Sequence, residues 1–327
     1  MPTIITHYLF AKACMDTLSG NEVLASIEQH GDAFCLGAQG PDILFFALGH
    51  TAMNRLGGRM HHEGINRFFA ESINYVRKKT ANEGRNELIA YMAGFMCHYA
   101  LDTCTHPYIY YKTGFSGEDG RLSKGSQERH HFLETTIDCI LSEKLEDKNP
   151  YFLNISEKIT VKPKKRALIG QFLSDTVNAG YGLPIYPEYY IKAMKDTAFV
   201  YRVLHDKDGV RKKVLGAAGK VIGGAAVAAS MIHYEPVLPL DYLNEQHATW
   251  HYPWDNTIDL YFSFMDLFNK AVDDGRIYIN AFMNALNKKL DDKKALSILG
   301  DKNFSTGLES PVDFLYYNIE FNKLIRE

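Results

Sequence analysis

The sequence predicts an all-α fold, a multi-helix bundle with extra helices in its C-terminal half. Apolar residues recur at intervals of three and four along most of the 327 residues, which is the spacing of an amphipathic helix. No segment shows a convincing alternation of apolar and polar residues, the pattern typical of a half-buried strand. Hydrophobic residues make up 46% of the chain and charged residues 23%, as in a globular protein with a sizeable buried core.

Segments with the helical pattern follow one another through the N-terminal half, at residues 6–18, 65–80, 86–106 and 127–145. Thr6 is expected to cap the first of these helices. Segment 86–106 is apolar almost all round, which predicts a central, buried helix. Pro107 follows it directly, so we expect this helix to end or bend around His106.

Glycine-rich or polar segments predict loops between these helices, at residues 36–46, 48–62 and 112–127. The composition changes near residue 150, and we expect residues 1–150 to form one helical core. Residues 151–327 are expected to add helices that pack on the same body, including one over 257–275. Segment 243–256, "LNEQHATWHYPWDN", is interpreted as a surface helix or turn that ends at Pro253.

The charge balance gives no strong nucleic-acid signal, because the net charge is −3. The N-terminal residues lack the basic segment and the cleavage site of a signal peptide. The five cysteines match no disulfide or CxxC framework, which indicates reduced thiols and a cytoplasmic protein. Residues 214–232 are rich in small residues, but Lys220 interrupts them, so we expect a packed helix or a lid and not a membrane span.

The segment "GFMCHYALDTCTHPYIYY" places His98, Asp102 and His106 four residues apart in an otherwise apolar and aromatic run. Residues four apart on a helix share nearly the same face, so His98 and Asp102 point together. An ionised carboxylate in an apolar environment is costly unless it is paired. A metal ion removes this cost because it requires deprotonated ligands. The pattern indicates metal binding, whereas a single pair of this kind is also typical of a local hydrogen bond or ion pair.

A second pair, His130 and Glu134, is also four residues apart, with His131 as a neighbour on a different face. Further candidate donors in the N-terminal half are His7, Asp42, His61 and His62. Nitrogen and oxygen donors without a cysteine pattern favour zinc, with iron or manganese as rivals. Cys97 and Cys104 flank the site in sequence and are interpreted as core residues.

Five motifs, in this order, resemble the zinc-dependent phospholipase C family: "THYLFAKACMD", "FCLGAQGPDILFF", "RMHH", "GFMCHYALDTCTHPYI" and "HHFLE". The zinc-binding region of GPI-specific phospholipase D belongs to the same group. The superfamily also includes the secreted, single-strand-specific zinc nucleases of fungi and plants. The resemblance covers roughly residues 1–145, and it implies the helical bundle of the phospholipase C and zinc nuclease superfamily.

The resemblance also implies a ligand set for each of two or three zinc ions. The sets are Asp42 with His98, Asp102 and either His61 or His62; His106 with His130 and Glu134; and His7 with a bridging Asp102. In the secreted bacterial phospholipases the mature N-terminal residue also holds the third zinc. This chain departs from that pattern, because it has only a short lead before His7, and removal of Met1 would expose the amine of Pro2.

Such a site implies phosphodiester hydrolysis, in which a zinc-bound hydroxide attacks phosphorus and a metal stabilises the leaving alkoxide. Asp42 is the candidate for a ligand that also takes a proton from the attacking water. The expected substrate is a phospholipid or another phosphodiester, with transient contact to a membrane surface. The candidates for an apolar approach to the site, unless they only pack on the core, are Phe45, Phe46, Tyr108, Tyr110 and Tyr111.

Two alternatives remain for the function. The same metal core would suit a single-strand nuclease or nucleotide phosphodiesterase, which needs aromatic stacking and a basic groove. A non-catalytic, metal-stabilised helical scaffold would use the same ligands for folding alone.

Overall fold

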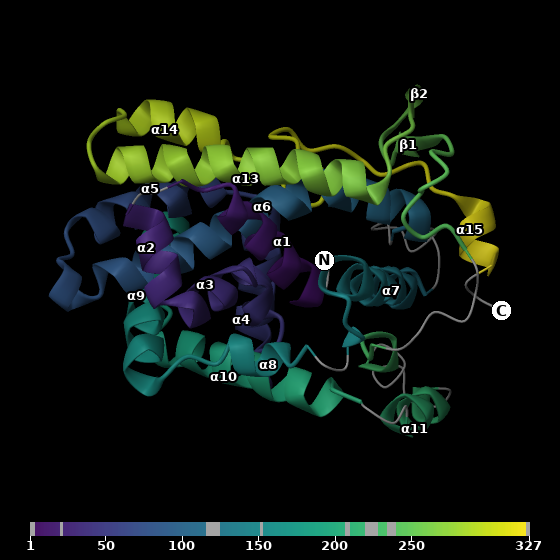
Figure 1. Ribbon diagram of the computed structural model, residues 1–327, viewed down its shortest axis with the longest axis horizontal. Coiled ribbons are helices and arrows are strands. Elements are labelled where there is room, and N and C mark those ends of the chain that lie inside the picture. Colours follow the sequence, from purple (N-terminus) through teal and green to yellow (C-terminus); the bar gives the residue numbers. More distant parts are fainter. Residues whose placement is uncertain are drawn as a thin grey trace.

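The structure is a computed structural model that describes residues 4–19, 22–115, 125–150, 153–206, 210–219, 228–233 and 240–324. Met1, Pro2 and residues 220–227 of the small-residue segment lie outside these ranges. The elements, labelled as in Figure 1, are α1 (Ile4–Asp16), α2 (Glu22–Gln29), α3 (Gly31–Gly37), η1 (Gly40–Leu44), α4 (Thr51–His62), α5 (Ile65–Arg77), η2 (Ala81–Glu83), α6 (Arg85–Thr113), α7 (Ser126–Glu146), α8 (Ile155–Lys158), α9 (Pro163–Tyr181), α10 (Pro187–Leu204), α11 (Val210–Gly219), β1 (Trp250–Tyr252), β2 (Asp255–Leu260), α13 (Phe264–Leu286), α14 (Asp292–Leu299) and α15 (Ile319–Leu324).

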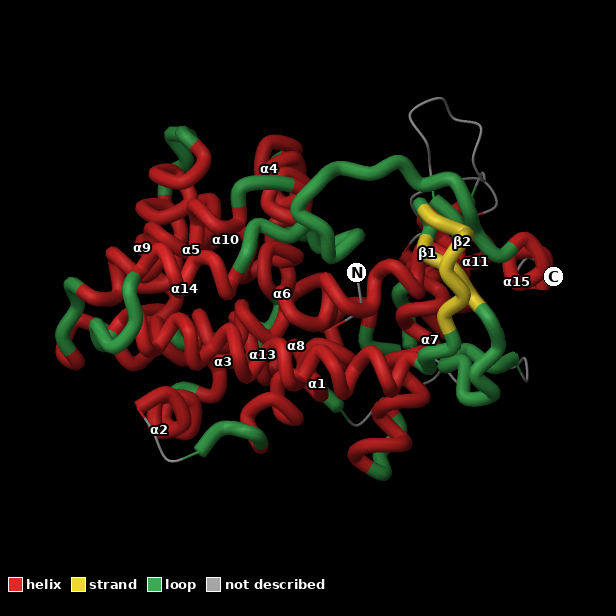
Figure 2. Tube along the Cα trace, turned by 90° about the horizontal axis from the view of Figure 1, so that it is seen from above, coloured by secondary structure: helices red, strands yellow, loops and turns green. Residues whose placement is uncertain are grey.

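The predicted all-α fold is confirmed, since the described residues form strands only in one small sheet of β1 and β2. Figure 2 shows this sheet at one end of the molecule, near α7 and α15. Figure 1 shows α13 and α14 along one edge and α10 and α11 along the opposite edge. Among the described residues, no helix has both the length and the apolar character needed to cross a membrane.

The helix α6 forms the centre of the bundle, as its apolar sequence predicts. Nearly every side chain from Leu88 to Ile109 is buried. Helices from both sides of residue 150 pack against it, chiefly α3 and α13. The division of the chain into residues 1–150 and 151–327 stays a prediction.

Of the two outcomes expected around His106, an end or a bend, the end is wrong, because α6 continues through Pro107 to Thr113. Proline lacks the N–H that would bond to the carbonyl of Thr103, four residues earlier. Gly307, from a distant loop, lies directly against that carbonyl oxygen. Packing on all sides therefore maintains the helix, and His98, Asp102 and His106 share one continuous element.

Two further boundaries differ from the expectations. Thr6 is not a cap but lies inside the first turn of α1, and its N–H and hydroxyl both donate to Asp138 Oδ1, at 2.7 and 2.5 Å. The expected loop over 48–62 is mostly the helix α4. Met53 and Met60, seven residues apart, are buried on one side of that helix. This spacing is helical, but the glycines of the segment led to the prediction of a loop.

The segment interpreted as a surface helix or turn forms a β-hairpin, with Trp250 paired with Leu260 across the two strands. The Trp250 indole packs edge-on against the Tyr108 ring of α6, with the ring centroids 5.4 Å apart. The helix expected from residue 257 begins only at Phe264, because Ser263 and Asp266 form a capping box there.

Candidate metal centre

The predicted donors come together at the middle of the bundle, on α1, η1, α4, α6 and α7. They form three groups whose ligand atoms lie within 4.8 Å of one another: His7 with Asp42 and His98; His61 with His98 and Asp102; and His106 with His130 and Glu134. All of these side chains are buried. Of the donors predicted from the sequence, only His62 belongs to none of the groups.

The first two groups share His98 and surround one small volume. Asp42 Oδ1 lies 3.0 Å from His61 Nε2 and 3.7 Å from His98 Nε2. Asp102 Oδ2 lies 3.1 Å from His98 Nε2, and Asp102 Oδ1 lies 3.4 Å from His7 Nε2. The His7 and His98 rings stack with their centroids 4.1 Å apart.

The third group adjoins the others through Asp102, whose Oδ2 is 3.8 Å from His106 Nδ1. Within the group, Glu134 Oε1 lies 2.9 Å from His130 Nε2 and 3.8 Å from His106 Nε2. Asp102 faces the donor nitrogens of His7 through Oδ1 and of His98 through Oδ2, so it is the carboxylate placed to bridge ions of the first two groups, and the His106 ring lies beside it.

Backbone carbonyls orient three of the imidazoles. Nδ1 of His61 lies 2.6 Å from Gly57 O, Nδ1 of His98 lies 3.2 Å from Ala38 O, and Nδ1 of His106 lies 2.9 Å from Phe304 O. A carbonyl oxygen only accepts hydrogen bonds, so each Nδ1 carries the proton and each Nε2 presents a lone pair. This is the arrangement by which outer partners fix the tautomer of a metal-binding histidine.

The chemistry of the donor set fits a metal. Buried polar atoms are normally hydrogen-bonded. Both ring nitrogens of His7, Nε2 of His98, Nε2 of His106 and both carboxylate oxygens of Asp102 are buried, yet none has a hydrogen-bond partner in the described part of the chain. Divalent cations would use these lone pairs and would offset the cost of burying them.

Burial also sets the protonation of the cluster. It raises the pKa of Asp102 to about 8 and lowers the pKa of His98 and of His130 to about 4. It also lowers the pKa of His7 and of His106 well below the usual value. These four imidazoles are therefore neutral at pH 7, as metal ligands must be, whereas Asp102 has a proton to lose on metal binding.

The turn before Asp42 explains how that residue reaches the cluster. Gly40 has φ +50°, and a Cβ there would lie 2.3 Å from the His98 ring. Only glycine lets the backbone pass this close to the imidazole, after which Asp42 enters the site from η1.

The His61–His62 doublet ends α4, and its two side chains face different ways. His61 is buried beside Asp42, whereas His62 is exposed, with Nδ1 3.1 Å from Asn303 Nδ2. A helix separates successive side chains by about 100°, so only one of the two enters the site.

A loop after α14 contributes contacts that the sequence does not reveal. Phe304 donates its N–H to His61 O at 2.8 Å, and its carbonyl accepts the Nδ1–H of His106. Its ring lies 4.8 Å from the His61 ring and 5.8 Å from the His98 ring. Main-chain contacts between residues about 200 positions apart leave no local pattern, so no motif could have identified this loop.

Two cysteines near the donors in sequence, and two histidines of the hairpin segment, add no ligand to these groups. Cys97 is in the core, and the Cys104 thiol donates to Leu267 O at 3.3 Å. His247 bonds to Tyr261 O, and His251 lies 3.5 Å from Asp259 on the hairpin. None of these four belongs to a potential metal group among the described residues.

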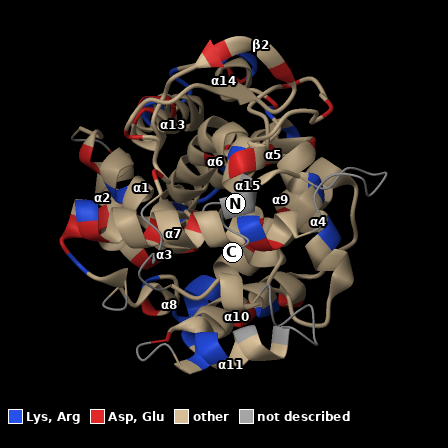
Figure 3. Cartoon of the chain, turned by 90° about the vertical axis from the view of Figure 1, so that its right-hand side faces the viewer, with Lys and Arg blue, Asp and Glu red and all other residues tan. Residues whose placement is uncertain are grey.

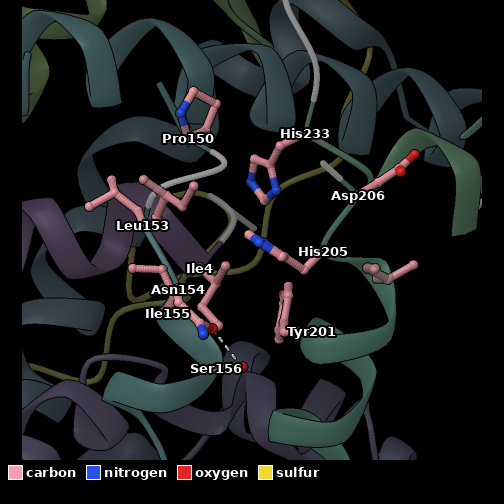
Figure 4. Close-up of a pocket in the computed structure, with 12 residues that line it drawn as sticks. Ile4, Pro150, Leu153, Asn154, Ile155, Ser156, Tyr201, His205, Asp206 and His233 are labelled. Atoms are coloured by element: carbon pink, nitrogen blue, oxygen red, sulfur yellow. Dashed lines mark hydrogen bonds between the residues drawn. The ribbon is translucent and has the colours of Figure 1, made fainter. Parts of the chain in front are cut away.

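A small pocket of about 20 Å³ lies next to the cluster, between the start of α1, α8 and the end of α10 (Figure 4). Ile4 in its wall is one turn before His7 on α1. His233, also in the wall, bonds through Nε2 to Asp138 Oδ2 at 2.7 Å, one turn after Glu134 on α7. The wall of the pocket at Ile4 is thus about one helical turn from His7, and no candidate donor is among the described residues that line the pocket itself.

Comparison with models of protein families shows to which family the chain belongs. A model of zinc-dependent phospholipase C matches residues 6–179, which is more than half of the chain. The chain belongs to the zinc-dependent phospholipase C family. Neither the curated proteins nor the solved structures include a significant match.

The donors of this phospholipase C family member all fall within the matched segment, from His7 to Glu134. The zinc dependence of the family agrees with the three groups of nitrogen and oxygen donors. The Phe304 loop lies beyond the match, so part of the support for the cluster comes from outside the family segment.

Proposed function

We propose that this chain is a zinc-dependent phosphodiester hydrolase that cleaves a phospholipid and releases its phosphorylated head group. The observation that supports this most directly is that the three donor groups lie side by side, with Asp102 facing His7 and His98 and the His106 ring next to it. Zinc ions held there would supply Lewis acidity towards the phosphate oxygens and a water molecule with a lowered pKa.

Asp42 is the residue that we assign to proton transfer. It is 7% exposed, whereas Asp102 is 0% and Glu134 is 1% exposed. Its carboxylate is therefore the one that an attacking water can reach, and it would accept the proton of that water. Its Oδ1 lies 3.0 Å from His61 Nε2, so a zinc ion held by His61 would lie beside it.

Aromatic side chains flank the cluster and provide an apolar approach. The Tyr110 ring lies 4.9 Å from the His130 ring, and the Phe45 ring lies 5.2 Å from the His61 ring. Tyr108, by contrast, is fully buried and donates its hydroxyl to Tyr242 O, so it packs in the core. An acyl chain or glycerol backbone would pack against Tyr110 and Phe45 while its phosphate meets the donors.

The decisive experiment combines metal content with two substrates. Protein purified without chelator is analysed for zinc, then assayed on phosphatidylcholine micelles and on single-stranded DNA. We expect zinc in the wild type, release of a phosphorylated head group from the lipid, and loss of both in the His98→Ala, Asp102→Ala variant.

Each contrary outcome identifies an alternative. Cleavage of DNA but not of lipid would make the chain a nuclease. Bound zinc without hydrolysis of either substrate, together with unfolding on chelation, would make it a metal-stabilised scaffold. The cytoplasmic location expected from the sequence stays a prediction.

A further inference from the structure

The outer side of α10 and the neighbouring helix α11 combine exposed apolar and cationic side chains. Phe199 and Val203 on α10 are 54% and 46% exposed. Val210 and Val214 on α11 are 58% and 62% exposed. Large apolar side chains exposed together on a soluble protein mark an interaction site more often than single ones do.

The cations are interleaved with these apolar residues along the same helix faces. Lys195, Phe199 and Arg202 are spaced by four and three residues on α10, so they lie on one face. Val210, Lys213 and Val214 have the same kind of spacing on α11. We name this set of seven residues the α10–α11 surface: Lys195, Phe199, Arg202, Val203, Val210, Lys213 and Val214.

The two helices are joined where they meet. The Arg211 guanidinium donates to the carbonyl of Val203, in the last turn of α10, and to that of His205, directly after the helix. Figures 1 and 3 both place α10 and α11 along the same edge of the molecule, and Figure 3 shows Lys and Arg at that edge. The chain as a whole has a net charge of −3, so the positive charge at this edge is opposite in sign to the net charge.

Nearby acidic groups do not cancel this charge. Asp196 pairs with Lys192 on its own helix and accepts the N–H of Leu48. Asp206 is buried and accepts the N–H of Lys212. The exposed cations of the α10–α11 surface therefore face solvent without carboxylate partners in the described contacts.

We propose that the α10–α11 surface docks the protein on an anionic phospholipid bilayer. Helices with cations beside exposed apolar side chains bind in the plane of a membrane interface, where apolar burial and attraction to anionic lipids add together. A nucleic-acid backbone would use the cations but would leave Val203, Val210 and Val214 without a partner. The proposal goes beyond the reaction and holds for any phosphodiester that the metal centre cleaves.

Docking in this orientation would bring the bilayer close to the metal centre. The inner side of α10 carries Thr197, whose hydroxyl bonds to Ile43 O, next to Asp42. The outer side of the same helix carries Phe199 and Arg202. One helix, about 10–12 Å across with its side chains, therefore separates the proposed membrane surface from the turn that bears Asp42.

Vesicle flotation of the zinc-loaded full chain tests the proposal. Vesicles of phosphatidylcholine alone are compared with vesicles that also contain phosphatidylglycerol. We expect the wild type to float with the anionic vesicles and not with the neutral ones. Removing one cation near an anionic surface weakens binding about fivefold, so Lys195→Glu, Arg202→Glu, Lys213→Glu together should weaken it by roughly a hundredfold or more.

A matched control makes the same charge change at the opposite edge of the molecule. Lys289→Glu, Lys293→Glu, Lys294→Glu alters exposed lysines around α14 and should leave vesicle binding within about twofold of the wild type. A second variant, Phe199→Ser with Val214→Ser, keeps every cation and should lose the binding that persists at high salt. All variants should keep the wild-type circular dichroism spectrum and melting temperature, which shows that they fold whether or not the chain is a hydrolase.

Several results would overturn the docking proposal. They are no flotation of the wild type with anionic vesicles, an equal loss in the α14 control, and wild-type flotation of the α10–α11 variant. Binding of single-stranded DNA instead of vesicles would also reject it in favour of a nucleic acid. Vesicle binding is read without hydrolysis, so a failure of the proposed reaction would not be mistaken for a failure of docking.

Discussion

The substitution Gly307→Ala is expected to weaken zinc binding, although Gly307 lies outside residues 6–179, which match the family model. Gly307 has φ +70°, and a Cβ there would lie 2.4 Å from Thr103 O. Thr103 follows Asp102 on α6, and its carbonyl is the one left without a helical donor by Pro107. The same loop carries Phe304, which bonds to the backbone of His61 and to the ring of His106.

The size of the effect follows from this geometry. An alanine at a left-handed backbone position costs about 1–2 kcal/mol. The added methyl group must also move about 1 Å away from the carbonyl to reach an ordinary contact distance, and the buried α6 cannot yield. The loop shifts instead, and Phe304 loses its hold on His61 and His106. Loss of such an outer partner weakens metal binding about ten- to a hundredfold.

The assay is zinc affinity by competition with a chromophoric chelator, with urea unfolding of the metal-free chain alongside. Gly182→Ala is the matched control, because Gly182 has φ +66° and open space around its Cα. It should lose about 1 kcal/mol of stability by backbone strain and keep its zinc affinity. Wild-type zinc affinity in Gly307→Ala would refute the idea that this loop supports the cluster.

Three more predictions concern individual side chains. Asp138→Asn removes the charged acceptors of two backbone N–H groups at the start of α1. It should lower the free energy of unfolding by roughly 3 kcal/mol, measured by urea titration, and displace His7, measured as less bound zinc. Unchanged stability and zinc content would contradict this. The raised pKa of Asp102, about 8, makes the native metal-free chain bind more protons than the unfolded chain up to that pH. The free energy of unfolding of the metal-free chain should therefore fall as the pH rises from 6.5 to 8, by up to about 1.4 kcal/mol per pH unit. Zinc uptake at pH 7 should release about one proton per chain, measured with an indicator dye. Uptake without proton release would show that Asp102 is already ionised. His61→Ala should lose zinc and His62→Ala should keep it, by elemental analysis; the reverse would exchange their roles.

The candidate donors could be selected from the sequence because their signal is local. His98 with Asp102 and His130 with Glu134 are pairs four residues apart, and a helix brings such pairs together whatever surrounds it. The failures arose where tertiary packing outweighed a local signal. Pro107 does not stop α6, because the surrounding elements enclose the helix on every side.

The support for the donors could not be predicted in the same way. His98 and His106 are oriented by the carbonyls of Ala38 and Phe304, and any residue type can supply a carbonyl. The choice between His61 and His62 likewise depends on the rotation of α4, which the structure determines through the buried side of that helix. Donor identity is thus a property of the sequence, whereas donor orientation is a property of the packed fold.

The number of bound ions distinguishes a catalytic centre from a structural one. Eight side chains contribute donors, and Asp102 directs its two oxygens to different groups. Two ions sharing eight donors would each have four, the closed coordination of structural zinc. Three ions with Asp102 as a bridge would average three protein ligands each, which leaves a position for water or a phosphate oxygen, as in catalytic zinc sites. We therefore expect elemental analysis to give about three zinc ions per chain; a firm value of two, unchanged by added zinc, would contradict this three-ion arrangement.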